Sequence, residues 1–345
     1  MSRRRWIGAA LAVLGIAAGL AAGVTWYRRP APAPAEHAIL NGISAEEGIA
    51  IAYASGPLAR DCTDAAIAII LDGKVAYTNA WGREKAASHR YEWGSVSKTV
   101  TALITMELVE SGKLRLDQPI WEIDPKYETL IPAAKRTPPI TVERLLTHTA
   151  GITRQTKRGT AAMFWKPAGK YRYSSNGYGV LGDVLRAVSG QTYPELVGSL
   201  VNEKIQHTHI AAHSDSFIAP AALVTSNIAD FAAFAIGFLD DRFVSAATRA
   251  EMSRAQVTMP AAEWTEELSA SGPRPDGYGY GFEVASGGAT PIIAHSGKNG
   301  AKRAFLYLQP EFHRGVVGFC TAKRKNGPVT WWSVTDDIFA RLDAD

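Results

Sequence analysis

Gly94-Ser95-Val96-Ser97-Lys98 predicts both the start of a helix and a reactive serine. Helical periodicity continues over residues 96–110 and stops at Ser111-Gly112, where glycine is typical of a helix C-cap. Because residues three apart share one helix face, the Lys98 amine can reach the Ser95 hydroxyl. The helix terminus also stabilises negative charge and presents unpaired backbone N–H groups. A desolvated neutral lysine beside a serine therefore indicates nucleophilic catalysis.

Taken alone, this spacing is a weak signal. A serine and a lysine three residues apart occur on the order of once by chance in a chain of this length. Their ordinary meaning is a helix N-cap serine and a surface lysine. Two later stretches change that balance, namely Tyr173-Ser174-Ser175-Asn176 and His295-Ser296-Gly297, the second of which lies in a predicted strand.

In this order, the three motifs resemble those of the serine β-lactamase and penicillin-binding protein family. Within the family, the chain is most similar to the branch of class C β-lactamases, D-Ala-D-Ala carboxypeptidases and related esterases. The likeness covers about residues 60–340 and includes four further stretches: 145–152, 177–182, 226–230 and 278–282. His148 lies in the first of these, where we expect a hydrogen-bonding residue at a helix end.

The resemblance implies a covalent acyl-enzyme mechanism. Ser95 would be the nucleophile and Lys98 its proton acceptor, while Tyr173 would relay protons to the leaving group and the deacylating water. The backbone N–H groups of Ser95 and of Lys298, which follows Gly297, would form the oxyanion hole, each donor worth about 2.7–4 kcal/mol. The substrate would be a small-molecule or peptide amide or ester, such as a peptidoglycan fragment or a β-lactam. No metal or organic cofactor is implied.

His295 stands where many members of the family carry lysine. The resemblance implies that its imidazole places a proton donor or a partial charge beside the substrate carboxylate or Tyr173. Since an imidazole has an ordinary pKa near 6.5, we expect a more pH-sensitive activity than a lysine would give. We also expect Ser296, Gly297 and Lys298 to contact the substrate.

The second motif departs from the family pattern of tyrosine, any residue, asparagine. Its third place is Ser175, and Asn176 comes one residue late. Two registers are open, Tyr173 with Ser175 or Ser174 with Asn176. Residues 177–182 match the tyrosine register without a gap, so we favour Tyr173 and assign both Ser175 and Asn176 to substrate binding. Loss of the usual amide disfavours efficient β-lactam hydrolysis more than ester or D-aminoacyl cleavage.

Strand patterns occur near both ends of the chain, and helix-and-loop patterns lie between them. Residues 64–81 predict a hairpin with a turn at Asp72-Gly73-Lys74. Later segments predict three strands and a closing helix: 291–295, 304–308, 315–321 and 327 onward. This order predicts an α+β fold, in which an antiparallel sheet formed from both chain ends is flanked by helices and carries an inserted helical lobe.

The first part of the 345-residue chain carries its basic charge. Residues 1–29 contain five arginines and no acid, so residues 30–345 hold 32 basic and 33 acidic residues, a net charge of −1. That body offers no basic surface for nucleic acid, and a nucleic-acid-binding function is excluded. The 22 uncharged residues 6–27 predict a helix of about 33 Å, enough to cross a membrane.

These observations predict three parts: an anchor or signal over 1–29, a Pro/Ala linker over 30–39 and a hydrolase domain over 40–345. A cleaved secretory signal is the alternative to an anchor, but signal apolar regions are usually shorter. In both cases we expect an exported, periplasmic or extracytoplasmic domain. The stronger basic charge before residue 6 keeps the N-terminus inside, so residues 6–27 would anchor the domain in the inner membrane.

The chain has two cysteines, Cys62 and Cys320. In the family's sheet the first strand runs antiparallel beside the last, so Cys62 before the first strand could approach Cys320 near the end of the last. Because an exported domain permits disulfides, we predict this bond, with two free thiols as the alternative.

Two other interpretations are a metal site and a non-catalytic role. His207, His209 and His213 lack a carboxylate at metal-ligand spacing, which favours a solvated loop over a metal site. A non-catalytic ligand-binding module with the same fold is the rival function, although the serine, lysine and tyrosine set argues against it.

Overall fold

The computed structural model describes residues 39–40, 61–82, 89–152, 166, 168–206, 210–261, 275–286, 291–324, 335 and 338–339. Across these residues, one large sheet is antiparallel at every pairing. Its strands run in the order β1 (Ile39–Leu40), β3 (Lys74–Trp81), β2 (Cys62–Leu71), β12 (Arg314–Ala322), β11 (Lys302–Gln309), β10 (Ile292–Asn299), β9 (Glu283–Ala285), β8 (Gly277–Tyr278) and β7 (Val257–Thr258).

The predicted hairpin and the three late strands meet at the centre of this sheet. Asp72 and Gly73 both adopt positive φ angles, 50° and 68°, which suit a tight two-residue turn between β2 and β3. Strand β2 then pairs with β12, with Ala68 opposite Val317. The sheet is therefore built from both ends of the chain, as the sequence predicted.

Both faces of the central strands are buried, which explains the continuous apolar run 65–70. Ala66, Ala68 and Ile70 pack into the main core, whereas Ala65, Ile67 and Ile69 pack into a second cluster that also contains Ile338 and Phe339. Alternate residues of a strand point to opposite faces, so a strand covered on both sides has no polar positions.

Helix α4 (Ser97–Glu110) lies at the centre of the main core. Residues 97–106 are all buried, which is typical of a helix that is surrounded by other elements. Helical spacing of the apolar residues Val100, Leu103, Ile104 and Leu108 indicates one buried face, whereas this helix is buried on all sides over those ten residues. The difference arises because α8 (Ser175–Ser189) and α11 (Ala219–Ala222) contact this helix directly. Helix α12 (Ile228–Leu239) packs on β2 and β12, and its residues belong to the same core cluster as those of α4.

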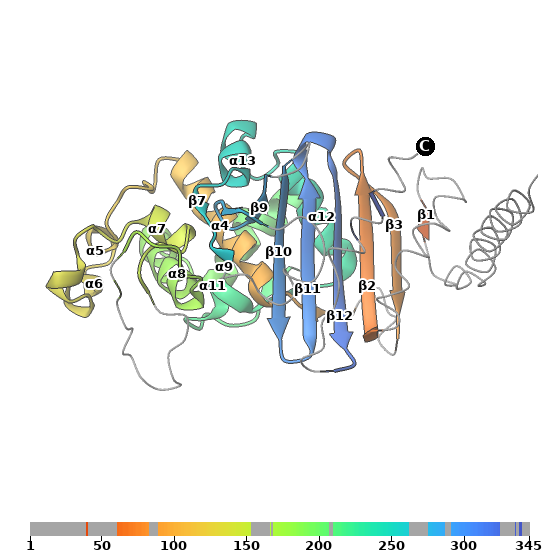
Figure 1. The fold of residues 1–345 in the computed structure, drawn as a ribbon, viewed down its shortest axis with the longest axis horizontal. Coiled ribbons are helices and arrows are strands. Elements are labelled where there is room, and N and C mark those ends of the chain that lie inside the picture. The colour runs from red at the N-terminus through yellow and green to blue at the C-terminus, as the bar shows by residue number, and fades with distance from the viewer. Residues whose placement is uncertain are drawn as a thin grey trace, which may run out of the picture.

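The inserted lobe between the two parts of the sheet is helical, as predicted. Figure 1 shows its elements α5 to α8 grouped on the far side of β10 from β2 and β3. The remaining helical elements and turns are η1 (Gly94–Val96), α5 (Ile120–Ile123), α6 (Lys126–Leu130), η2 (Ala133–Lys135), α7 (Val142–Leu146), α9 (Tyr193–Val197), η3 (Gly198–Asn202), α10 (Glu203–Ile205), α13 (Ala246–Ser253) and η5 (Pro310–Phe312). A small sheet joins β4 (Tyr91–Glu92), β6 (Val224–Ser226) and β5 (Ala211–Ala212).

Cys62 and Cys320 form a disulfide, with their Cα atoms 5.6 Å apart. The bond links β2 to β12, the neighbouring strands contributed by the two ends of the chain. The predicted pairing is confirmed.

Several predictions fall outside the described residues. These are the membrane helix over 6–27, most of the linker over 30–39, His207, His209 and most of the closing helix. Of the closing helix, residues 335 and 338–339 are described, and they are helical. In the described part of the chain, no helix is long and apolar enough to cross a membrane.

Candidate active site

The turn before α4 brings the Ser95 hydroxyl next to the amine of Lys98. Ser95 is half-buried within η1, and Lys98, one turn later, is fully buried. The Lys98 Nζ atom donates a hydrogen bond of 3.1 Å to Ser95 Oγ. The N-cap position of α4 is Val96 and makes no side-chain cap, so the interpretation of a capping serine and a surface lysine is wrong.

The Lys98 amine donates hydrogen bonds to oxygen atoms of Ser95, Ser175 and Ala221. Besides Ser95 Oγ, its Nζ atom donates to Ser175 Oγ at 3.3 Å and to the Ala221 carbonyl at 2.9 Å, and it lies 4.9 Å from the centroid of the Tyr173 ring. An ammonium group has three hydrogens for three acceptors. A neutral amine can keep the Ala221 and Ser175 bonds and turn its lone pair to the Ser95 hydroxyl. Lys98 can therefore accept the serine proton while it keeps its bonds to Ala221 and Ser175.

The neighbouring residues Ser174 and Ser175 have different roles at the start of α8. Ser174 is the N-cap, and its hydroxyl accepts a hydrogen bond of 3.0 Å from the Gly177 N–H. Ser175 begins the helix and directs its hydroxyl to Lys98. Asn176 is buried in the same turn, with 4% of its surface exposed. The geometry favours the register of Tyr173 with Ser175, because the Ser174 hydroxyl already caps the helix.

The two backbone groups expected to bind the oxyanion lie where η1 meets β10. A Cβ atom on Gly297 would lie 2.0 Å from the Trp93 carbonyl oxygen and 3.0 Å from the Ser95 nitrogen. A Cβ atom on Gly94, whose φ is +53°, would lie 2.8 Å from the Lys298 nitrogen. Only glycine allows the two backbones to approach this closely. The Ser95 and Lys298 nitrogens therefore border one junction.

His295 differs from the prediction. It is 1% exposed; its Nδ1 atom donates to the Ser296 carbonyl at 2.8 Å, and its Nε2 atom accepts from the Tyr278 hydroxyl at 3.2 Å. Burial is the main cause that lowers the pKa of His295 to about 3, and the neighbouring Lys98 amine acts in the same direction. This lowered pKa keeps the imidazole neutral near pH 7, which argues against the pH-sensitive activity expected from this residue.

The partners of His295 also limit its role as a proton donor. Its Nδ1 hydrogen is held by the main-chain carbonyl of Ser296, an oxygen that can only accept. The centroids of the His295 and Tyr173 rings are 6.3 Å apart. The structure thus places His295 beside Tyr173 as a neutral, hydrogen-bonded ring. Farther along β10, Ser296 is half-buried and Lys298 is exposed.

An aromatic wall behind Tyr173 was not assigned from the sequence. Its members are His148, Tyr178 and Tyr278, and the His148 ring centroid lies 4.4 Å from that of Tyr173. The His148 Nδ1 atom accepts a hydrogen bond of 3.1 Å from the Ser174 N–H, in agreement with a hydrogen-bonding role at the end of α7. Burial raises the pKa of both Tyr178 and Tyr278, which keeps these rings neutral.

Sequence signals for the remaining contacts differ. Tyr278 opens the 278–282 stretch of the family resemblance, which is a usable signal. Ala221 offers none, because it contributes a main-chain carbonyl and not a side chain. Among the residues that the structure describes, no cluster of histidine, cysteine, aspartate and glutamate could hold a metal ion.

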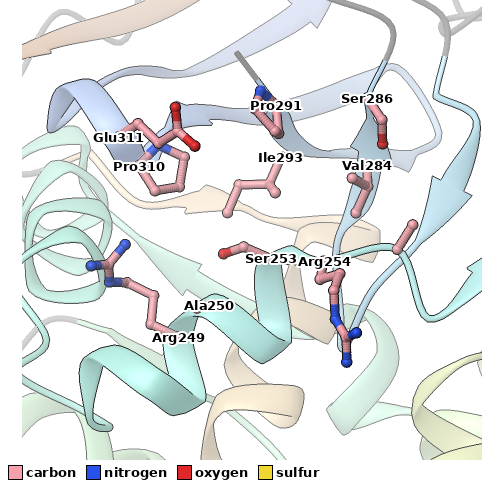
Figure 2. A pocket seen from close by; sticks show the side chains of 11 residues that line it. Arg249, Ala250, Ser253, Arg254, Val284, Ser286, Pro291, Ile293, Pro310 and Glu311 are labelled. Atoms are coloured by element: carbon pink, nitrogen blue, oxygen red, sulfur yellow. The ribbon is translucent and has the colours of Figure 1, made fainter.

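A separate pocket of about 310 Å³ lies between α13, β10 and η5 (Figure 2). Arg249 and Arg254 border it, and both are neutralised, Arg249 by Asp241 and Arg254 by Glu251. The pocket contains none of the three residues Ser95, Lys98 and Tyr173. It is therefore distinct from the serine and lysine site.

Similarity to known proteins identifies the family of this chain. Residues 50–336 match the Beta-lactamase family. The chain belongs to this family. Members of the Beta-lactamase family are serine hydrolases of the β-lactamase and penicillin-binding protein type, so the resemblance and fold expected from the sequence are confirmed.

Individual members of the family show where this chain is similar. It is 26% identical over 336 residues to penicillin-binding protein 4 of Amycolatopsis lactamdurans, a match that covers 81% of this chain and 84% of that protein. The octameric penicillin-binding protein homologue from Pyrococcus abyssi superposes with a TM-score of 0.68 at 21% identity, over 86% of this chain and 77% of that one. SurE, solved with D-Leu, superposes with a TM-score of 0.68 at 20% identity, over 87% and 75%.

Proposed function

We propose that this protein is a serine hydrolase that cleaves an amide or ester bond through an acyl-enzyme on Ser95, with carboxypeptidase-like or esterase-like activity. One observation carries the proposal: the fully buried Lys98 amine lies 3.1 Å from Ser95 Oγ. A serine hydroxyl needs an adjacent base to attack an acyl carbon, and removal from water disfavours the charged form of a lysine.

The proposed reaction has two stages. Ser95 Oγ attacks the acyl carbon as its proton passes to Lys98 Nζ, and the Ser95 and Lys298 N–H groups stabilise the oxyanion. The tetrahedral intermediate collapses, the leaving amine or alkoxide takes a proton, and Ser95 remains acylated. A water molecule then attacks the acyl group, its proton passes back through the site, and Ser95 is released. Tyr173, beside Lys98 and half-buried, is the family's proton relay to the leaving group and to this water.

The substrate is proposed from the contacts of Lys98. Ser175 occupies the place of the usual asparagine and directs its hydroxyl to the amine, so that position offers no amide to hold a substrate carbonyl. This substitution supports a simple ester or a D-aminoacyl compound over a β-lactam as the substrate that is turned over. The structural neighbour solved with D-Leu is consistent with a D-aminoacyl group.

We also propose that the domain works outside the cytoplasm, anchored by residues 6–27. Two observations support this location. The chain carries 22 uncharged residues between Arg5 and Arg28, and the Cys62–Cys320 disulfide is a bond that persists in oxidising compartments.

Intact mass spectrometry tests the proposal. The full chain and its Ser95→Ala variant would be incubated separately with a penicillin and with an activated acyl ester. A mass increase on the wild type that is absent in Ser95→Ala identifies the nucleophile. Rapid ester turnover without a lasting penicillin adduct supports an esterase, a stable adduct supports a penicillin-binding peptidase, and hydrolysed penicillin supports a β-lactamase. Equal behaviour of the two proteins would overturn the catalytic assignment in favour of a ligand-binding module.

A further inference from the structure

Two serine hydroxyls from distant parts of the chain meet on one buried amine. Lys98 Nζ lies 3.1 Å from Ser95 Oγ and 3.3 Å from Ser175 Oγ. Ser95 precedes Lys98 by three residues, whereas Ser175 follows it by 77 and belongs to α8. The helix does not need the Ser175 hydroxyl as a cap, because Ser174 performs that task. The Ser175 hydroxyl therefore contacts Lys98 although α8 does not need it for capping.

The three oxygens around Lys98 differ in what they can do with a proton. The Ala221 carbonyl is an acceptor only, so it holds one amine hydrogen in place. A hydroxyl both accepts and donates, so Ser95 and Ser175 are the two of these groups through which a proton can move. Ser95 delivers the proton to Lys98 in the proposed reaction. Ser175 is hydrogen-bonded to the same amine and can take this proton from Lys98.

We infer that Ser175 is a second catalytic proton carrier, which passes the proton from Lys98 to the leaving group in parallel with Tyr173. This inference rests on the proposed function. As the acyl-carbon bond to the leaving group breaks, the Ser175 Oγ–H bond breaks and its proton joins the departing nitrogen or oxygen. At the same time an Nζ–H bond of Lys98 breaks and a new Oγ–H bond forms on Ser175. Lys98 ends neutral, Ser175 ends unchanged, and the protons balance.

The exposure of the two carriers fits a position between Lys98 and the substrate. Lys98 itself is fully buried, whereas Ser95, Tyr173 and Ser175 are all half-buried. A proton that leaves Lys98 for the substrate can therefore pass through one of these partly exposed groups. Lys98 Nζ lies 4.9 Å from the centroid of the Tyr173 ring and 3.3 Å from Ser175 Oγ.

A leaving-group comparison separates a proton carrier from a merely structural serine. The full chain would be assayed on two esters of one acyl group, a nitrophenyl ester, whose leaving group departs without protonation, and a methyl ester, whose leaving group needs a proton. If Ser175 carries the proton, Ser175→Ala lowers kcat/KM for the methyl ester by about 10²-fold, the scale of general acid catalysis. The nitrophenyl ester loses only the few-fold expected from one missing hydrogen bond.

Companion variants make the result specific. Ser175→Thr keeps a hydroxyl and is expected to restore cleavage of the methyl ester, whereas Ser175→Asn keeps an acceptor for Lys98 but carries no hydroxyl proton and is expected to resemble Ser175→Ala. Ser189→Ala removes a hydroxyl from the last turn of the same helix and serves as the matched control. Tyr173→Phe should retain part of the methyl ester activity, and its combination with Ser175→Ala should lose that part.

Two outcomes distinguish the inference from the function on which it rests. Equal loss on both esters in Ser175→Ala, with Ser95→Ala inactive, would overturn the Ser175 inference and leave the hydrolase intact. Wild-type activity in Ser95→Ala, or failure of the wild type to cleave either ester, would overturn both.

Discussion

The structure predicts that His295 is neutral over a wide pH range, whereas the sequence alone suggests an imidazole with an ordinary pKa. The ring is 1% exposed, and both of its nitrogens are hydrogen-bonded, to the Ser296 carbonyl and to the Tyr278 hydroxyl. Burial, and to a smaller extent the neighbouring Lys98 amine, lowers the pKa of His295 to about 3. We therefore expect His295 to stay neutral throughout the pH range in which a hydrolase is assayed.

The sign and size of the effect on stability follow from proton linkage. An unfolded chain binds a proton on this histidine below about pH 6.5, whereas the native protein does not bind it until about pH 3. The stability contributed by the neutral ring is thus fully present above pH 6.5 and is lost as the pH falls toward 3. The slope approaches about 1.4 kcal/mol per pH unit, and the whole difference is on the order of 5 kcal/mol.

Urea unfolding at several pH values measures this term. Between pH 6.5 and 4.5, the free energy of unfolding of the wild type should fall by about 2–3 kcal/mol relative to His295→Gln. The matched control is His313→Asn, which removes an exposed imidazole at a positive φ of 45° that asparagine tolerates. We expect this control to keep the acid dependence of the wild type.

Nitrogen NMR of the wild type provides a second measurement that needs no variant. The His295 ring should keep its proton on Nδ1 and show no titration down to pH 4. The pH profile of acylation should likewise contain no step from this residue between pH 5 and 8. A His295 signal that titrates between pH 6 and 7, or parallel unfolding curves for wild type and His295→Gln, would refute the reasoning.

Three further predictions concern the backbone junction, the disulfide and the helix cap. Gly297→Ala would place a Cβ atom 2.0 Å from the Trp93 oxygen, so we expect it to displace an oxyanion donor and slow acylation by about 10²-fold or more, measured by burst kinetics against Gly198→Ala, where a Cβ meets nothing within 4 Å. Replacement of Cys62 by serine should lower the free energy of unfolding by about 2–5 kcal/mol, because a loop of 258 residues is no longer closed in the unfolded chain; identical melting with and without reductant would argue against this. Ser174→Ala should lower stability by about 1 kcal/mol through loss of the cap, and an unchanged urea midpoint would contradict that role.

Much of the fold was predictable because its signals are local. The turn at Asp72-Gly73, the alternating or continuous apolar runs of the strands and the glycine that ends α4 each act within a few residues. The contact between Ser95 and Lys98 is local in the same sense, since helical geometry alone brings residues three apart together. The disulfide was different: its prediction depended on the strand order of the family.

The candidate site was only partly predictable, since its electrostatics depend on packing between distant segments. No local pattern indicates that Ser174 caps a helix while Ser175 contacts Lys98, or that Ala221 supplies a carbonyl to the same amine. The burial of His295 could not be read from its place in a strand. Whether a histidine titrates near neutral pH depends on what covers it.

The sequence by itself determined the α+β class, the hairpin over residues 64–81 and the approach of Lys98 to Ser95, because each of these follows from short-range spacing or from the order of the predicted elements. Tertiary structure decided which hydroxyls surround Lys98, that His295 is neutral, and that glycines at 94 and 297 let two backbone segments meet. The reason is physical: desolvation and hydrogen-bond partners arise only when α4, α8 and β10 are packed together, and no spacing along the chain specifies them.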